Sequence, residues 1–186
     1  ASSNASIILN GGGKIIGSKV ERHDDEDPNV AFADIAADIS DGSTLKATNV
    51  DFTGGIEASA GNEAPIGSKV VLNGGSVTAG KFYDKANNPL YSTEISASGS
   101  GSSVELNKVK IDSNLGAFDG GVLTVNDSNV NADAAIFASG KGAVINLNSS
   151  DGKATYTVGE DGVEAFDGGV INIKGGTLHT TNISVE

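Results

Sequence analysis

Short aliphatic segments with alternating apolar positions recur along the chain, and they end on a polar or charged residue. Seven copies align with one another, at residues 7–10, 45–48, 70–73, 104–107, 123–126, 145–148 and 171–174. In five of these copies the closing residue is asparagine, as at Asn73 and Asn107. Alternation with a period of two predicts a half-buried β-strand. A strand that recurs in this way indicates a solenoid, because each unit buries its apolar side only against its neighbours.

Two other short segments recur between these copies. One has an apolar residue followed two positions later by alanine, at residues 35–37, 56–58, 95–97, 115–117, 136–138 and 163–165. The other recurs at residues 50–52, 77–79, 109–111 and 130–132. Glycines at 42, 101, 120 and 168 precede the aliphatic segments, and we expect them to supply turns with positive φ.

Three strands separated by turns make one coil, so the pattern predicts an all-β chain folded as a right-handed parallel β-helix of about seven coils. The coil length varies, since Leu106, Val125 and Leu147 lie 19 and 22 residues apart, and no six-residue period typical of left-handed solenoids appears. The regular apolar pattern argues against disorder despite 26 glycines. We expect the recurring asparagines to occupy corners in the αL conformation and to bond to the copies above and below.

Two insertions interrupt the repeat, at residues 17–33 and 80–94, and both are expected to leave the same side of the rod about 10 Å apart. They contain the residues that we predict to form a contact surface: Arg22, His23, Asp24, Asp25, Asp27, Lys81, Phe82, Tyr83 and Tyr91. The acidic run is typical of a solvated loop. A calcium site at its carboxylates is the alternative, although an EF-hand spacing is absent. The aromatic residues fit either stacking on sugar rings or fixing the loop to the rod.

Composition and motifs restrict the partners and the chemistry. The formal net charge is −12 and Arg22 is the only arginine, so nucleic acid and anionic membrane surfaces are not expected as partners. Without cysteine there is no disulfide or thiolate metal site. No apolar stretch reaches the about 20 residues of a transmembrane helix, so we expect no membrane insertion. There is no nucleophile elbow, phosphate-binding loop or dinucleotide fingerprint, and we predict no cofactor and no enzymatic activity.

Residues 101–111 (GSSVELNKVKI) and 115–122 (LGAFDGGV) resemble passenger domains of bacterial autotransporters, in particular pertactin-like and AIDA-type β-helix adhesins. The likeness covers most of residues 4–184. It implies secretion, display at the bacterial cell surface, and a role in adhesion, self-association or biofilm formation, with a host protein, a glycan or like rods as partners. It also implies a translocator barrel in the full-length protein. The Ala-Ser-Ser-Asn start and the lack of methionine are typical of a mature product or an excised piece. Because residues 184–186 end without a polar cap, we expect residues 1–186 to be a single segment of a longer passenger.

Two other functions remain open at this point. A polysaccharide-acting β-helix enzyme, such as a lyase of acidic glycans, requires lysine or arginine in a groove with carboxylates beside it. The outward strand residues are scattered and mostly neutral or lysine, which does not favour that reading. A purely structural surface spacer requires neither a groove nor a contact surface.

Overall fold

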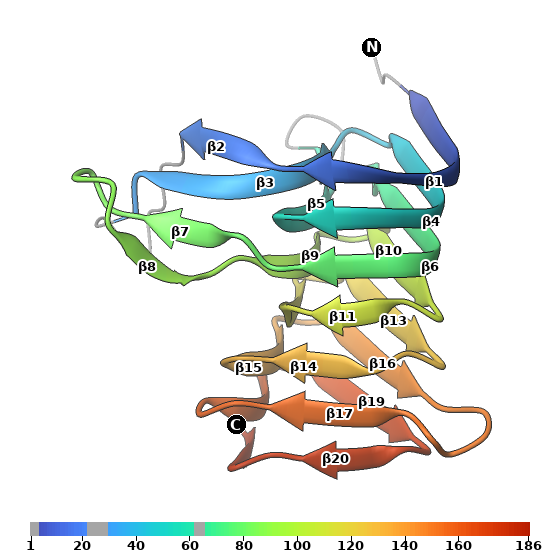
Figure 1. Ribbon diagram of the computed structural model, residues 1–186. Helices are drawn as coiled ribbons and strands as arrows, with labels where there is room; N and C mark the ends of the chain where they lie inside the picture. The colour runs from blue at the N-terminus through green and yellow to red at the C-terminus, as the bar shows by residue number, and fades with distance from the viewer. Residues whose placement is uncertain (1–3, 22–29, 62–65) are drawn as a thin grey trace.

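The computed structural model describes residues 4–21, 30–61 and 66–186, and every regular element in them is a β-strand. The chain is therefore all-β in its described part, as predicted. Two sheets curl around one apolar core, and most of their strands pair in parallel (Figure 1). Within these residues no helix is present that could cross a lipid bilayer.

The first sheet has eleven strands and contains two ladders that share its long strands. The seven aliphatic segments form one ladder: β1 (Ser6–Ile16), β4 (Thr44–Thr53), β6 (Lys69–Thr78), β10 (Ser103–Asn107), β13 (Val122–Asn126), β16 (Val144–Asn148) and β19 (Val170–Lys174). The later halves of β1, β4 and β6 continue into the second ladder with β11 (Lys110–Asp112), β14 (Val130–Ala132), β17 (Thr155–Val158) and β20 (Thr177–His179).

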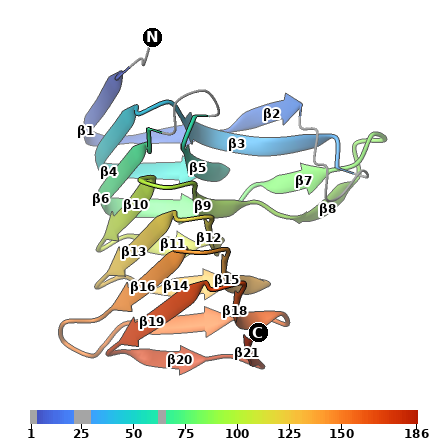
Figure 2. The same cartoon turned by 180° about the vertical axis from the view of Figure 1, so that it is seen from behind.

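The second sheet has ten strands. Its parallel ladder consists of the alanine-bearing strands: β3 (Phe32–Ile39), β5 (Gly55–Ser59), β9 (Glu94–Ser98), β12 (Asn114–Phe118), β15 (Ala135–Ser139), β18 (Gly162–Phe166) and β21 (Ile183–Val185). Three further strands pair antiparallel beside it: β2 (Ser18–Glu21), β7 (Lys81–Tyr83) and β8 (Pro89–Ser92). Both views show β2, β3, β7 and β8 extending to one side of the stacked strands (Figures 1 and 2).

The register of the first ladder follows the sequence repeat. Leu72 lies opposite Leu106, Leu106 opposite Val125, and Val125 opposite Leu147, so that inward side chains form a continuous column. These four side chains are at most 1% exposed. Burial of each such aliphatic side chain contributes about 1.5–3 kcal/mol, and this repeated column stabilises the parallel stack.

The recurring asparagines form a hydrogen-bonded ladder on the outside of the stack, as predicted. The Nδ2 group of Asn107 donates to Asn73 Oδ1 at 3.0 Å, and that of Asn126 donates to Asn107 Oδ1 at 2.8 Å. Asn148 continues the series by donating to Asn126 at 2.9 Å. Their expected αL conformation is wrong: none of the four asparagines has a positive φ, which falls on the next residue at Gly74, Lys108 and Asp127 (69°, 55° and 49°). At these positions the chain turns at the residue after the asparagine, and the asparagine itself still belongs to the stacked ladder.

Two of the predicted registers are also shifted. Phe52 and Ile111 both lie opposite Val77, so Val50 and Val109 are not equivalent to it. In the second sheet a register shift after Ile35 places Ala37, and not Ile35, opposite Ile56. In the first case no residue is inserted: Val50 and Phe52, like Val109 and Ile111, are both buried, and the apolar pattern does not show which of the two pairs with Val77. In the second case an additional residue lies between Ile35 and Ala37, and the apolar pattern does not reveal this irregularity.

Pairs of glycines precede two of the aliphatic strands, and each position of the pair requires glycine for a steric reason. Gly120 and Gly168 have φ of 90° and 85°, as the sequence predicts. The glycine that follows each of them lies against the neighbouring strand, and a Cβ on Gly121 would be 2.1 Å from the carbonyl oxygen of Ala97. The close approach of adjacent strands therefore requires the second glycine as well.

Candidate functional site

The described parts of the two inserted segments form one small antiparallel sheet with the start of β3. We call this sheet the flange: β2, residues 32–35 of β3, β7 and β8. In β3, the part before Ile35 extends past β5, which begins opposite that residue. β2 pairs with one edge of this extension, with Val20 opposite Ala33. β7 pairs with the other edge, with Phe82 opposite Ala33. The insertions were expected to be neighbouring loops, but their free backbone groups are satisfied by pairing with each other through β3.

The β7–β8 hairpin is closed at both ends by short-range hydrogen bonds. At its base the Gly80 amide donates to Thr93 Oγ1 at 2.8 Å, and the Thr93 amide donates to the Gly80 carbonyl at 3.1 Å. At its tip the Asp84 carboxylate accepts bonds from the backbone and the side-chain amide of Asn88, both at 2.8 Å. The Asn88 side chain, followed by its backbone amide, lowers the pKa of Asp84. These contacts fix the hairpin without an apolar core of its own.

One face of the flange carries charged and polar contacts. Tyr83 donates its hydroxyl hydrogen to Asp34 Oδ2 at 2.8 Å, and this bond is the main cause that raises the pKa of the Tyr83 phenol. The Lys81 backbone amide donates to the same carboxylate oxygen at 3.2 Å. Lys19 Nζ lies 3.4 Å from the centroid of the Tyr83 ring and donates to the Asn87 side chain. The contacts join β2, β3 and β7, which come from three separate parts of the sequence.

The opposite face of the flange is aromatic and partly open. Phe82 and Tyr91 lie with ring centroids 4.9 Å apart and ring planes inclined by 42°. Successive residues of a strand point to opposite faces, so Phe82 faces away from Lys81 and Tyr83. Val20 lies on the Phe82 face because both pair with Ala33, and Val20 and Tyr91 are each 44% exposed. This face therefore carries partly exposed apolar side chains.

The nine predicted contact residues thus divide into two groups. Lys81, Phe82, Tyr83 and Tyr91 lie together on the flange, but on two faces and not one. The other five lie outside the described residues, and with them the calcium alternative: Arg22, His23, Asp24, Asp25 and Asp27. Among the residues that are described, no three histidine or acidic side chains are placed to hold a metal ion.

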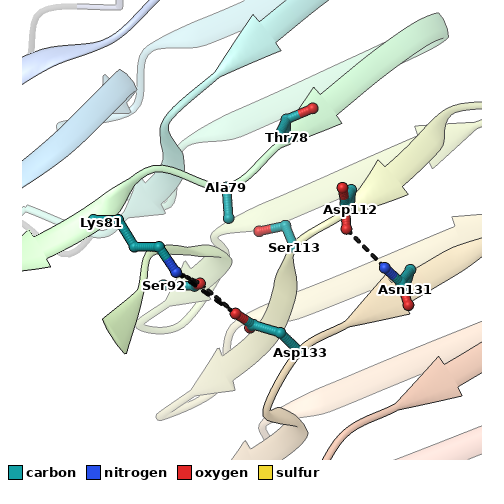
Figure 3. Close-up of a pocket in the computed structure, with 8 residues that line it drawn as sticks. All are labelled: Thr78, Ala79, Lys81, Ser92, Asp112, Ser113, Asn131 and Asp133. Carbon is teal, nitrogen blue, oxygen red and sulfur yellow. Dashed lines mark hydrogen bonds and ion pairs between the residues drawn. The ribbon is translucent and has the colours of Figure 1, made fainter. Parts of the chain in front are cut away.

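A polar cavity of about 190 Å³, which we call the junction pocket, lies where the flange meets the stacked strands (Figure 3). It is lined by Thr78, Ala79, Lys81, Ser92, Asp112, Ser113, Asn131 and Asp133. Lys81 Nζ lies 2.7 Å from Ser92 Oγ and 3.8 Å from Asp133 Oδ2, and the Ser92 hydroxyl donates to the same Asp133 oxygen. Asn131 Nδ2 donates to Asp112 Oδ1 at 2.8 Å. Flange and stack therefore both contribute to one site.

A second cavity, of about 390 Å³, lies beside the loop that joins β16 to β17. Its acidic groups are occupied by that loop. Asp127 accepts hydrogen bonds from the Ser150 amide at 2.6 Å and from the Ser150 hydroxyl at 3.0 Å, and these bonds lower the pKa of Asp127. The Lys153 amide bonds to Asp151 in the same way and lowers its pKa. We interpret this cavity as part of the loop structure.

Sequence reasoning missed most of the junction pocket. Asp112 and Asn131 occupy equivalent outward positions in successive strands, because Ile111 pairs with Val130, and this signal was present in the repeat. Nothing in the sequence indicated that Ser92 and Asp133 belong to one site, since they are brought together only by the docking of the β7–β8 hairpin.

Comparisons with known proteins do not identify a family: no protein-family model matches the chain, and no curated protein or solved structure matches it either.

Proposed function

We propose that the chain is a non-catalytic segment of an extracellular bacterial surface adhesin, in which a right-handed parallel β-helix of about seven coils carries the flange as its contact surface. The parallel registers and the single apolar core support the solenoid interpretation. The resemblance to autotransporter passengers supports surface display. A stack held by repeated contacts makes a stiff scaffold, and a scaffold of this kind suits adhesion to a host protein or glycan, or to a like rod.

The observation that carries this proposal is the flange itself. It departs from the repeat, extends to one side of the stack, and leaves the aromatic Tyr91 and the aliphatic Val20 substantially exposed. Tyrosine and phenylalanine supply contact area at a low cost in side-chain entropy, and they are enriched where proteins bind partners. Exposed apolar groups that the fold does not need for its core are typical of an interaction surface.

The proposal is tested by removing the aromatic pair of the flange. We expect the double variant Phe82→Ala/Tyr91→Ala to lose at least about tenfold in binding affinity, since two interface aromatics contribute about 1–2 kcal/mol or more together. Binding is measured on a glycan array and on immobilised host extracellular proteins, and self-association by light scattering.

The matched control is a second aromatic pair in the stack. Phe118 and Phe137 lie with ring centroids 5.0 Å apart on β12 and β15, remote from the flange strands in the sheet order. The variant Phe118→Ala/Phe137→Ala should bind and associate as the parent does. Equal loss in both variants, or no loss in the flange variant, contradicts the assignment of the flange as the contact surface.

One observation favours the alternative function, a polysaccharide-acting enzyme: in the junction pocket Lys81 lies beside carboxylates. A lyase of acidic glycans needs a cation to neutralise the uronate group and a base to remove a proton. Lys81 is already paired with Asp133 and Ser92, and the two acidic side chains of the pocket oppose an anionic substrate. Incubation with polyuronates, with and without calcium, decides between the two: unsaturated chain ends would establish the lyase. A spacer would bind nothing in either assay.

A further inference from the structure

The junction pocket has a lining that matches hydroxyl groups better than any other ligand chemistry. Its side chains are two carboxylates, one amide, three hydroxyls and one ammonium, and Ala79 is the only apolar member of the set. Carboxylates accept hydrogen bonds, hydroxyls and amides both donate and accept, and the ammonium donates. A ligand that complements this set must itself donate and accept at several closely spaced positions.

The lining groups retain hydrogen-bonding capacity after their internal contacts are counted. A carboxylate has about four acceptor positions. Among the contacts that line the pocket, Asp112 accepts one hydrogen bond from Asn131, and Asp133 accepts one from Ser92 and forms an ion pair with Lys81. Ser113 is 1% exposed, and its hydroxyl lies 3.3 and 3.4 Å from two backbone carbonyl oxygens, near the limit of a hydrogen bond. Figure 3 shows Ser113 between the Asp112–Asn131 pair and the Lys81–Ser92–Asp133 group.

The charge and the volume of the pocket further restrict the ligands that it can bind. Two carboxylates face one ammonium in the pocket, and the whole chain has a formal net charge of −12. Phosphate, sulfate and uronate groups are therefore repelled. The cavity of about 190 Å³ is smaller than the roughly 300–1,000 Å³ of pockets for drug-sized ligands, which limits the occupant to one small unit. A single neutral sugar residue fits both restrictions.

We propose that the junction pocket binds one neutral hexose unit of a glycan, with Asp112, Asn131 and Asp133 on the stack side and Lys81 and Ser92 on the flange side. This inference rests on the adhesin function and names the ligand class that it would recognise. The aromatic pair is not part of this subsite, because Phe82 and Tyr91 lie on the other face of the flange. A glycan chain that enters the pocket would reach the flange and the stack together.

Binding is tested with the complete 186-residue chain and with methyl glycosides of glucose, galactose, mannose and N-acetylglucosamine. The backbone amide signals of Ser92, Ser113 and Asn131 are followed by NMR during each titration. We expect at least one glycoside to shift these signals saturably, with a dissociation constant of about 1–10 mM, as is reasonable for one small ligand. Glucuronate and inorganic phosphate, added as anionic probes, should shift them less than the best neutral glycoside.

A pair of matched variants separates the pocket from the rest of the outer surface. Asn131 and Asn172 are both exposed, and each donates one side-chain bond to the neighbouring strand, to Asp112 at 2.8 Å and to Asn146 at 2.9 Å. We expect Asn131→Ala to weaken binding at least about fivefold, the loss of roughly one hydrogen bond, and Asn172→Ala to leave it unchanged. Asp133→Asn, which preserves the side-chain shape, should weaken binding as well.

Each outcome supports or overturns the inference. It is overturned if no neutral glycoside shifts the pocket signals, if an anionic probe binds better than all neutral ones, or if Asn131→Ala and Asn172→Ala behave alike. Failure here is separate from failure of the adhesin proposal. Adhesion that depends on Phe82 and Tyr91 without monosaccharide binding would remove only the sugar subsite. Monosaccharide binding without flange-dependent adhesion would remove only the adhesin function.

Discussion

In the stack, Leu106 is completely buried between Leu72 and Val125, whereas in the flange Tyr91 is 44% exposed and packs its ring against that of Phe82. The stack repeats one apolar contact at each strand, so its stability is distributed along the ladder. The flange uses different contacts at each position, most of them polar, and those that join β2, β3 and β7 connect segments far apart in the sequence. The comparison indicates that the stack can lose the flange and remain folded, but the flange cannot form without β3, which pairs with both β2 and β7.

The largest effect should come from the apolar column of the stack. Leu106→Ala leaves a cavity where the side chain was completely buried, and we expect it to lower the free energy of unfolding by about 2–5 kcal/mol. Glu105→Gln, on the opposite side of the same strand, should change it by no more than about 0.5 kcal/mol. Urea unfolding measures both, and similar values for the two variants would contradict the stacked column.

A smaller and local effect is expected in the flange. Asp34→Ala removes the acceptor of the Tyr83 hydroxyl and of the Lys81 amide, which should favour local opening by about 1–2 kcal/mol. Hydrogen exchange of the β7 amides should accelerate, while exchange in β10 and β13 stays as in the parent. Asp38→Ala, in the part of β3 that pairs with β5, is the control. Faster exchange throughout the stack would show that the two regions are not independent.

Tyr156 offers a test of polar groups inside the core. Its side chain is completely buried between Val130 and Leu178, and its hydroxyl is the one buried side-chain polar atom without a hydrogen-bond partner in the described part of the chain. Burial raises the pKa of this phenol, with a further contribution from Asp127. Tyr156→Phe should therefore stabilise the stack by up to about 1 kcal/mol in urea unfolding. Destabilisation beyond that amount would indicate a hidden partner for the hydroxyl.

The weakest predicted effect depends on pH. Hydrogen bonds from Ser150 lower the folded-state pKa of Asp127 below the value of about 3.9 in an unfolded chain. Its contribution is therefore complete above that value and is lost as the pH falls through the lower folded pKa. The stability difference between the parent and Asp127→Asn should decrease as the pH is lowered below about 4. A difference that is constant from pH 7 to pH 2 would show that the carboxylate does not hold the loop in its charged form.

The repeat in the sequence predicted the columns of the stack because one physical requirement, an inward aliphatic side chain, recurs there at every strand. The Asn73–Asn107–Asn126–Asn148 ladder followed for the same reason. The predicted register failed at Val109 because Val109 and Ile111 are both buried, and the sequence does not show which of them pairs with Val77. It failed at Ile35 because an additional residue lies between Ile35 and Ala37. Such a residue has no apolar signature of its own.

The sequence predicted where the flange leaves the repeat, but not which strands pair to form it. Its aromatic and charged residues stood out from the repeat, yet nothing in residues 80–94 specifies that β7 pairs with the extension of β3. That pairing depends on β5 beginning only opposite Ile35, which leaves a backbone edge unpaired. The junction pocket depends in turn on the pairing, because it places Lys81 and Ser92 next to Asp133. Sites that form by docking of distant segments therefore cannot be predicted from a single sequence in this way.

The pairing of β3 with β7 is the central claim, since the contact surface and the junction pocket both require it. NMR of the complete chain can measure it through cross-strand proton contacts between Ala33 and Phe82 and between Phe32 and Tyr83. We predict these antiparallel contacts together with parallel ones that connect Leu72, Leu106 and Val125. Parallel contacts in the stack without any contact between β3 and β7 would mean that the insertions are separate loops, and the account of the flange would be wrong.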